Sequence, residues 1–363
     1  METEVVGQDR ALDALRRAAA RPGHAYLLVG PRGSGVEHAA REFAALLIGA
    51  ADDERSRSLV LRSVHPDVVE FEPTGPSYQI KEDVRGRILP EAARAPIEGD
   101  RKVLVLFEAE RLSGNNIHVS ANAILKTLEE PPARTVVILV TAVPDDLLPT
   151  IRSRCQRIDF DPIADAVVRA ALERDGIASE DAAVLAALSG GQIARAKALA
   201  GRLGPLRAAF ASAPARVDGY GAPALAIAQE LDAAVESAAA EVESQHKEEL
   251  EAFDAEMKRL GYDARQAQRM LRRIAERHKR ETRRTRIDLL IEGVTAIESV
   301  YRDALAAPAE PLNRDLPALS VSPRAAGEAL AACREARDAF LINEKGLVRL
   351  VALLMALPPA GAR

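Results

Sequence analysis

The chain has 363 residues, a formal net charge of −5 and 28% charged residues. Because a domain usually holds about 100 to 200 residues, this length predicts two or three domains. The negative net charge excludes a protein that binds nucleic acid through overall basicity, although a local basic surface stays open. Aromatic residues make up only 3% and tryptophan is absent, which favours packed helices over an aromatic-rich β-sandwich.

Cysteine content and apolar runs restrict the class of protein further. Cys155 and Cys333 are too few for a four-thiolate zinc site or a disulfide framework, so we predict no metal site. The N-terminal segment lacks the basic and apolar regions of a signal peptide, and no apolar run approaches the ~18 residues of a membrane span. These features predict a cytoplasmic protein.

Short apolar runs alternate with helical patterns over the first 160 residues. Strands are expected at 25–29, 103–107 and 135–140. Strands this apolar, separated by helices, predict a parallel sheet with helices on both faces, as in an α/β fold. Residues 49–80 carry little pattern, and we expect a loop-rich connection with one strand near 68–71.

Beyond Pro162 the strand signals nearly stop. The stretch 201–223 is rich in glycine and proline and is expected to be a linker or a loosely packed turn region. From residue 224 the composition is helical. We therefore predict an α/β domain over 1–162, a small helical lid over 163–203 and an all-α C-terminal domain over 204–363.

Charge is unevenly distributed in the predicted C-terminal domain. Residues 241–256 hold seven acidic side chains and one basic one, whereas residues 258–286 hold twelve Lys or Arg and three acids. Two interpretations stay open. The basic stretch is either a solvated helix that extends past the core, or an arm that contacts a phosphate backbone or an acidic partner.

A glycine-rich loop joins the first predicted strand to a helix. Gly30, Gly33 and Gly35 keep the frame of a P-loop, in which backbone N–H groups cradle phosphates. Val36 stands where that motif has Lys, and Glu37 where it has Ser or Thr. A carboxylate close to a phosphate is unfavourable, by about 4 kcal/mol per like-charge contact at ~4 Å and a dielectric constant of ~20. This pattern predicts a nucleotide-binding fold that has lost hydrolysis.

The second acidic motif of P-loop ATPases is also altered. Residues 102–107 form an apolar strand followed by Glu108 and Glu110. If Glu108 matches the catalytic glutamate, Phe107 occupies the position of the Mg²⁺-associated Asp. With a shift of one residue, Glu108 becomes the metal ligand instead. Both alignments stay open at this point.

Several stretches together resemble the AAA+ clamp-loader ATPase family, and most closely its delta-prime branch in bacterial DNA polymerase III. The resemblance covers residues 4 to 200 and becomes more diffuse beyond. It lies in Val6-Gly7-Gln8, His24 to Gly35, His65-Pro66-Asp67, Ala121 to Pro132, Ile151 to Cys155, and Ser189-Gly190-Gly191 through Arg195. The degenerate P-loop favours delta prime over the hydrolysing gamma/tau subunits.

The resemblance implies a role in trans for the Ser153-Arg154-Cys155 segment. Arg154 would be an arginine finger that meets the γ-phosphate held by a neighbouring ATPase subunit, with Ser153 and Cys155 as its motif context. Arginine suits this task because its planar guanidinium is permanently charged. Pairing of Arg154 with a carboxylate of its own chain is the structural alternative. Thr141 and Arg195 stand at positions that resemble sensor 1 and sensor 2, and without the P-loop Lys we expect Arg195 to be structural.

The resemblance also implies partners and cofactors. The partners would be the gamma/tau and delta subunits and, through the complex, the sliding clamp and primer–template DNA, with no membrane. No cofactor is expected, since ATP would be bound by partner subunits. Many relatives carry a four-Cys zinc module after the P-loop helix, but residues 49–67 hold no cysteine. Over 114–120 the chain is a few residues longer than the family pattern.

Two other functions stay open on the sequence alone. The chain could be an active ATPase of the gamma/tau or helicase-motor type with an unorthodox site. It could also be a nucleic-acid-binding scaffold that uses residues 258–286. In the delta-prime interpretation the isolated chain would have no ATPase activity of its own, but would belong to a complex with DNA polymerase activity.

Overall fold

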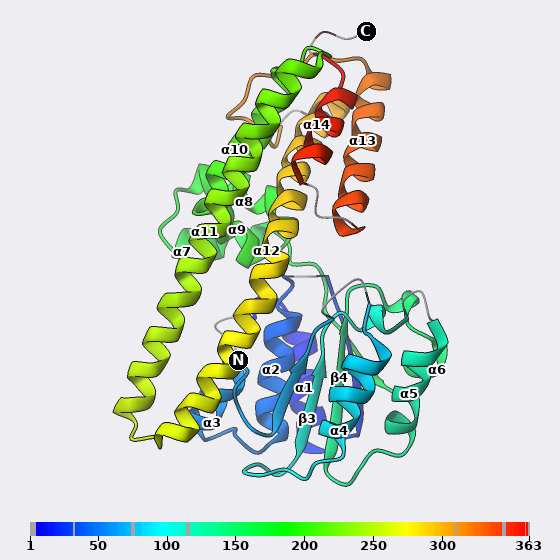
Figure 1. Cartoon of the computed structure of the whole chain (residues 1–363), viewed down its shortest axis with the longest axis vertical. Coiled ribbons are helices and arrows are strands. Elements are labelled where there is room, and N and C mark those ends of the chain that lie inside the picture. The colour runs from blue at the N-terminus through cyan, green and yellow to red at the C-terminus, as the bar shows by residue number, and fades with distance from the viewer. Residues whose placement is uncertain are drawn as a thin grey trace. The chain divides into compact units, whose positions relative to one another are not determined.

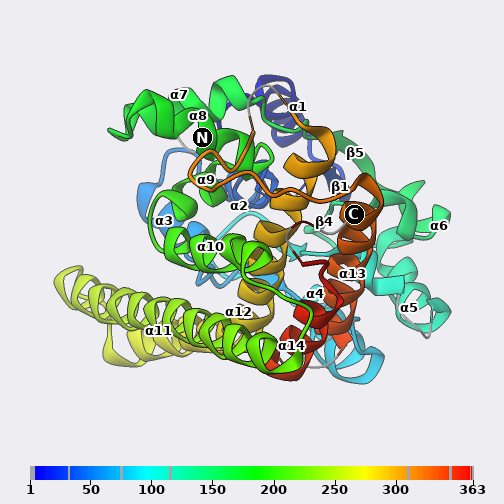
Figure 2. The ribbon, with the colours of Figure 1, turned by 90° about the horizontal axis from the view of Figure 1, so that it is seen from above.

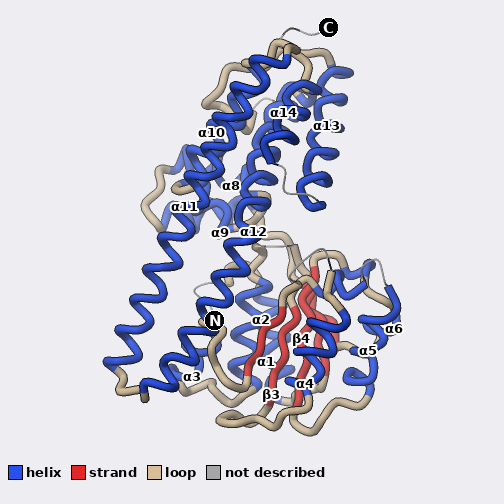
Figure 3. Tube along the Cα trace, viewed as in Figure 1, coloured by secondary structure: helices blue, strands red, loops and turns tan. Residues whose placement is uncertain are grey.

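The computed structural model of the protein describes residues 5–31, 33–73, 77–113, 117–308, 311–342, 346–359 and 361 (Figure 1). The chain divides into two compact units. The first comprises residues 1–171 and 190–194, and the second comprises residues 172–189 and 195–363. All described strands belong to the first unit (Figure 3). The proposed three-part division stays a prediction.

The first unit is built on a five-stranded, wholly parallel sheet with strand order β2-β3-β4-β1-β5. Its strands are β1 (Ala25–Val29), β2 (Val68–Phe71), β3 (Lys102–Leu106), β4 (Thr135–Thr141) and β5 (Gln156–Asp159). Its helices are α1 (Asp9–Ala20), α2 (Val36–Leu47), α3 (Glu54–Leu61), α4 (Leu89–Ala92), α5 (Ile117–Glu129) and α6 (Pro149–Arg152), with the shorter or irregular turns η1 (Ile80–Ile88), η2 (Ala109–Ser113) and η3 (Pro144–Asp146).

Alternate residues of each central strand enter two separate apolar cores, as expected for a period of two. In β1, Tyr26 and Leu28 pack with α1, α2 and α3, whereas Leu27 and Val29 pack with α4, α5 and α6. The sheet is therefore covered on both faces, which confirms the predicted α/β class and explains why its central strands are apolar throughout.

Two elements of this unit differ from the expectation. The charged stretch after Asp52 is helix α3, whose N-terminus is capped by the Asp53 carboxylate accepting from the backbone N–H groups of Arg55 and Ser56. Strand β5 lies at the sheet edge with only Ile158 buried, so its sequence lacks the apolar run that marks the other strands. Of the extended 114–120 loop, residues 114–116 lie outside the described part, and the rest belongs to α5.

The second unit is helical. Two helices straddle the boundary between the units, α7 (Asp165–Arg174) and α9 (Ile193–Ala200). The others are α8 (Ser179–Ser189), α10 (Leu203–Ser212) with the turn η4 (Ala213–Ala215), α11 (Gly221–Arg259), α12 (Ala264–Ala306), α13 (Pro323–Ile342) and α14 (Gly346–Ala356). Helices α10 to α14 share one apolar core that includes Phe210, Tyr301 and Phe340.

The Gly/Pro-rich stretch 201–223 is not a loose linker, and that expectation was wrong. It contains α10, and the ring of Phe210 is fully buried against α12. A Cβ at Gly293 would lie 2.5 Å from the Phe210 ring, so α12 can approach α10 this closely only with glycine at that position. Glycine here serves close packing rather than chain flexibility.

The longest helices, α11 and α12, form a hairpin and run side by side (Figures 1 and 2). The turn between them is set by local signals. Gly261 has a φ of +73°, and the N–H of Tyr262 donates to the Met257 carbonyl at the end of α11. Asp263 then caps α12 through the N–H of Arg265. None of the helices in the described residues is both long and apolar enough to span a membrane.

Candidate functional site: a degenerate P-loop and an exposed arginine

The glycine-rich loop leaves the carboxyl end of β1 and enters α2, the place where open α/β sheets bind ligands. Gly33 and Gly35 have φ of +74° and +89°, a region that favours glycine. A Cβ at Gly30 would lie 2.7 Å from Cβ of Phe160. The three glycines thus preserve the backbone path of a P-loop.

The side chains beyond this loop do not suit a nucleotide. Val36 is 1% exposed and belongs to the apolar core beneath the loop, together with Val5 and Phe107. Val5 approaches the loop itself, since its Cγ1 would lie 3.1 Å from a Cβ at Gly35. Glu37 follows in the first turn of α2 with its carboxylate partly exposed. The lysine that would bind phosphate is therefore replaced by the core residue Val36, and the hydroxyl that would hold Mg²⁺ is replaced by the carboxylate of Glu37.

Gln8, from the opening motif, fastens the N-terminal segment to this loop. Its side-chain amide donates to the backbone oxygens of Ser34 and Asp161, at 3.1 and 2.7 Å, and accepts from the N–H of Asp161 at 3.2 Å. The residue is 4% exposed. Gln8 therefore ties the P-loop to the segment after β5, which accounts for its place in the motif on structural grounds.

The guanidinium of Arg41, from α2, lies beside Phe107, the residue that follows β3 and matches the Mg²⁺-associated position of an ATPase in one alignment. Phe107 is buried, and the guanidinium of Arg41 lies 5.1 Å from the centroid of its ring. Arg41 also donates twice to the carboxylate of Glu70, at 2.8 and 2.9 Å. Burial lowers the pKa of Arg41, but the carboxylates of Glu70 and its neighbours outweigh burial and raise it. Arg41 therefore stays charged and remains paired with Glu70 inside the unit.

The two acids after Phe107 are engaged by neighbouring residues. Glu108, which has a φ of +50°, pairs with Arg111 at 2.8 Å. Glu110 accepts a hydrogen bond of 2.6 Å from the hydroxyl of Thr141, the sensor-1-like residue at the end of β4. Whether Glu108 is aligned with the catalytic glutamate or with the metal ligand, its carboxylate is paired with Arg111 of the same chain. The P-loop residues, Phe107 and these pairs do not fit a Mg²⁺–triphosphate.

The His65-Pro66-Asp67 motif is structural in this chain. The Asp67 carboxylate, which is fully buried, accepts from the backbone N–H groups of Ile97, Glu98 and Gly99 at 2.6, 2.7 and 2.7 Å. Its own N–H donates to Nδ1 of His65 at 3.1 Å. This motif therefore holds the loop before β3 against the segment that precedes β2.

Arg154 lies in the turn between α6 and the edge strand β5. Its guanidinium pairs with the carboxylate of Glu129 at 2.5 Å and donates to the carbonyl of Thr150 at 2.9 Å. The side chains of Arg154 and Glu129 are 35% and 47% exposed. An ion pair this exposed contributes roughly 0–1 kcal/mol, so another anion can replace Glu129 at little cost.

The residues beside Arg154 are held locally. The Ser153 hydroxyl donates to the Thr150 carbonyl at 3.2 Å. Burial raises the pKa of the Cys155 thiol to about 12, which keeps it protonated and unreactive. Arg152 pairs with Asp145 at 2.6 Å and Arg157 with Asp159 at 2.7 Å. Ser153 and Cys155 therefore support the backbone turn that presents Arg154.

Arg195, the sensor-2-like residue, is tied into the helical unit. It donates from two nitrogens to the carboxylate of Glu292 on α12, with distances of 2.7 to 3.0 Å, and from a third to the carbonyl of Leu188 at 2.6 Å. Both side chains of the ion pair are about one-fifth exposed, at 21% and 19%. The structural interpretation of Arg195 agrees with these contacts.

Sequence comparisons relate the N-terminal part of the chain to DNA polymerase III subunits. A family model described as "DNA polymerase III, delta subunit" matches residues 7–164. The delta-prime subunit of Pseudomonas aeruginosa is 37% identical over 143 residues, which cover 38% of this chain and 42% of that protein. The delta-prime subunit of Bacillus subtilis is 32% identical over 172 residues, or 46% and 50% of the two chains.

Gamma/tau subunits of DNA polymerase III are also similar in sequence. The gamma/tau subunit of Mycobacterium tuberculosis H37Rv is 34% identical over 194 residues, which cover 49% of this chain and 32% of that protein. Among solved structures, a DNA polymerase III gamma-subunit-related protein from Thermotoga maritima aligns over 95% of this chain and 97% of its own, with 18% identity and a TM-score of 0.48.

The family match, residues 7–164, lies within the first unit, whose loops carry the motifs described above. The chain spans about half the length, or less, of the curated relatives it matches, at 42% and 50% of the two delta-prime subunits. Over residues 7–164 the chain matches the family model of the DNA polymerase III delta subunit, and it is similar to delta-prime and gamma/tau subunits of DNA polymerase III.

Proposed function

We propose that this chain is the non-hydrolysing delta-prime subunit of a sliding-clamp loader, and that it supplies Arg154 to the ATP site of a neighbouring subunit. The observation that carries the proposal is a contrast within one unit. The P-loop position that should bind phosphate is Val36, buried in the core, whereas Arg154 is partly exposed in a turn beside an edge strand.

The chemistry of Arg154 suits a role in trans. Phosphoryl transfer develops negative charge on the equatorial γ-phosphate oxygens, and a guanidinium stabilises that charge through fixed, paired donors. Glu129 pairs with the guanidinium, and a γ-phosphate would replace that carboxylate as its partner. The neighbour would be a gamma/tau-type ATPase, with delta, the sliding clamp and primer–template DNA in the same complex. Such a complex would act in the cytoplasm.

The proposed role also gives meaning to the predicted domain division. Residues 1–162 would present the arginine turn, 163–203 would form a lid, and 204–363 would form the collar through which loader subunits associate. No bound nucleotide, metal or other cofactor of this chain takes part in the proposed mechanism. ATP would be held by the partner subunits.

The decisive experiment is a reconstituted clamp loader with this chain as wild type, Arg154→Ala or Arg154→Lys. DNA-stimulated ATP hydrolysis should fall greatly with both variants, because an arginine finger contributes roughly 10³-fold or more at its own site and Lys lacks the planar fork. Arg157→Ala is a matched control, since Arg157 is exposed on the adjacent strand and pairs with Asp159. Unchanged hydrolysis in a fully assembled Arg154→Ala complex would overturn the proposal.

An ATPase of the gamma/tau type is the second candidate, supported by a relative with 34% identity over 194 residues. An ATP titration of the isolated chain by calorimetry separates the two. Micromolar, Mg²⁺-dependent ATP binding with turnover would favour the ATPase. The buried Val36 and the Arg41–Glu70 pair instead lead us to expect no ATP turnover by the isolated chain.

The nucleic-acid scaffold is less well supported. Several cations of the basic stretch 258–286 pair with acids inside the helical unit. Arg277 lies 2.6 Å from Glu249, and Arg286 lies 2.8 Å from Asp232. A steep salt dependence of DNA affinity that is abolished by charge reversal in 258–286 would revive this function.

A further inference from the structure

Helices α11 and α12 each carry the pattern His-x-x-Glu, as His246 with Glu249 and His278 with Glu281. Residues three apart lie on one face of a helix. Because the two helices form a hairpin, the two patterns run in opposite directions. The imidazole of one helix therefore meets the carboxylate of the other.

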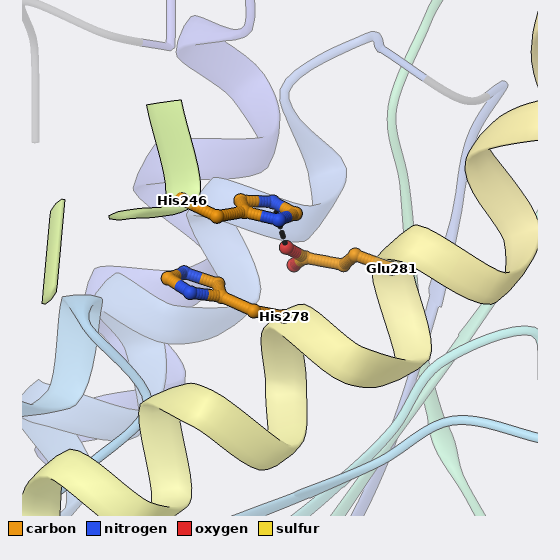
Figure 4. A group of neighbouring side chains, drawn as sticks. All are labelled: His246, His278 and Glu281. Carbon is orange, nitrogen blue, oxygen red and sulfur yellow. Dashed lines mark ion pairs between the residues drawn. The ribbon is translucent and has the colours of Figure 1, made fainter. Parts of the chain in front are cut away.

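Figure 4 shows one of the two pairs, His246 with Glu281, and the neighbouring ring of His278. Nε2 of His246 lies 3.0 Å from the Glu281 carboxylate, and Nε2 of His278 lies 2.9 Å from the Glu249 carboxylate. The two imidazole rings stack, with centroids 4.0 Å apart and planes 6° from parallel. One potential ligand atom from each of His246, His278 and Glu281 lies within 4.8 Å of the others.

Both imidazoles have a ring nitrogen without a partner among the described residues. Nδ1 of His246 and Nδ1 of His278 are buried and accept or donate no hydrogen bond. His278 itself is 5% exposed. Leaving a buried polar nitrogen unpaired is unfavourable, and native structures seldom do so without a reason. Two such nitrogens in one stacked pair are therefore candidates for binding a ligand.

The carboxylates of Glu249 and Glu281 flank the imidazole pair, and the guanidinium of Arg277 lies 3.2 Å from Nε2 of His278. Arg277 lies 2.6 Å from Glu249 but 3.5 Å from Glu281. Glu249 therefore pairs with Arg277 and can orient the His278 ring through its hydrogen bond to Nε2. Glu281 lies farther from Arg277, so its carboxylate is more available to a metal ion.

We propose that His246, His278 and Glu281 form a Zn²⁺ site that joins α11 to α12. Two imidazole nitrogens and one carboxylate are a common zinc ligand set, and a fourth position stays open for water or a partner side chain. Tetrahedral zinc with bonds of about 2.0–2.1 Å needs ligand atoms roughly 3.4 Å apart. The ligand atoms now lie within 4.8 Å of one another and the two rings are stacked, so binding of the ion would require the imidazoles to turn toward it.

Such a site would act where the hairpin has little apolar support. The buried residues of the main helical core reach Ala238 on α11 and begin again at Leu289 on α12. Between those positions the buried apolar side chains are Phe253, Met257, Ala267 and Ile274. A metal bridge there would stabilise the outer part of the hairpin. The low cysteine content does not argue against it, because none of its ligands is a thiolate.

The test uses the full-length chain, stripped with a chelator and titrated with Zn²⁺ alone by calorimetry. One equivalent should bind, and the thermal midpoint of unfolding should rise. His246→Ala with His278→Ala should abolish that binding, and Glu281→Gln should weaken it by at least about 10-fold. Matched controls are His24→Ala and Glu276→Gln, because both side chains are exposed and outside the cluster.

Circular dichroism will establish whether each variant keeps its helical content. If the double His variant does not fold, Glu281→Gln carries the test, because it keeps the shape of the side chain. Co²⁺ absorption in the visible range gives a second readout, in which bands typical of nitrogen and oxygen ligation should vanish with the same variants. Failure of the wild-type chain to bind Zn²⁺, or equal binding by Glu281→Gln and Glu276→Gln, would overturn the proposal.

Discussion

The guanidinium of Arg154 lies 2.5 Å from the carboxylate of Glu129 in the same chain. Both residues belong to the stretches that resemble the clamp-loader family. The pair is partly exposed, so another anion can replace Glu129, and the arginine also donates to the carbonyl of Thr150. We therefore predict that Glu129 orients the guanidinium of Arg154 through an ion pair weak enough for a phosphate to replace it.

Glu129→Gln should test that role. Because both partners are partly exposed, we expect the free energy of unfolding to change by less than about 1 kcal/mol in urea titrations. ATP hydrolysis by the reconstituted loader should be unchanged or modestly higher, since a competing anion has been removed. A loss as large as that of Arg154→Ala would show instead that Glu129 positions the arginine for its work.

Restoring the P-loop side chains should not restore an ATPase. Val36→Lys with Glu37→Thr places a charged amine in a buried core position, and we expect a loss of roughly 2 kcal/mol in unfolding free energy. Phosphate release should stay at the wild-type level, because Phe107 and the Arg41–Glu70 pair still occupy the metal side. Glu37→Thr alone is the control and should change stability by no more than about 0.5 kcal/mol. Turnover by the double variant would contradict this account of the site.

Asp67→Asn should be strongly destabilising. The substitution removes the buried charge that accepts from three backbone N–H groups and leaves at least one of them without its acceptor. We expect a loss on the order of 3 kcal/mol in unfolding free energy. Asp52→Asn, at an exposed position, is the matched control. Equal stabilities of the two variants in urea would show that the His65-Pro66-Asp67 motif has no structural role.

A double-mutant cycle on Arg195 and Glu292 should separate a structural role from a sensor role. The side chains form several hydrogen bonds and are mostly buried, so we expect a coupling free energy of roughly 1–3 kcal/mol in unfolding. Coupling near zero, together with slower hydrolysis by a loader that carries Arg195→Ala, would instead assign Arg195 to nucleotide sensing.

Acid stability should depend on Glu42, a buried residue of α2. Burial raises its pKa, but hydrogen bonds from His38 and Arg57 outweigh burial and lower it to about 2. A lowered pKa means that the stabilisation is present above the unfolded value of 4.5 and is lost as the pH falls toward 2. At full size this amounts to at most about 3 kcal/mol.

Glu42→Gln should therefore flatten the decline of unfolding free energy between pH 4.5 and 2, the window set by the two pKa values. The measurement is a series of urea titrations across that range for both proteins. Identical pH profiles would mean that the Arg57 and His38 contacts do not lower the pKa of this carboxyl in solution.

The sequence predicted the α/β unit well where apolar runs mark buried strands, as at β1, β3 and β4. It missed β5, whose side chains mostly face outward, and it took α10 for a linker because its Gly and Pro residues suggested turns. In α10 tertiary packing overrides those signals, since Phe210 fills the space left by Gly293. Local composition could not reveal a neighbour 83 positions away.

By itself, the sequence determined what is absent from the P-loop, because Val36 and Glu37 can be read directly at fixed positions of a motif. The turn between α11 and α12 also has local signals, Gly261 and Asp263, although the helical composition from residue 224 did not single them out. Only the tertiary structure decided which charges meet. The pairs Arg195–Glu292 and Arg154–Glu129, and the crossing of His246 with Glu281, depend on the register of elements far apart in the chain. No local propensity encodes that register, because it follows from how the apolar cores pack.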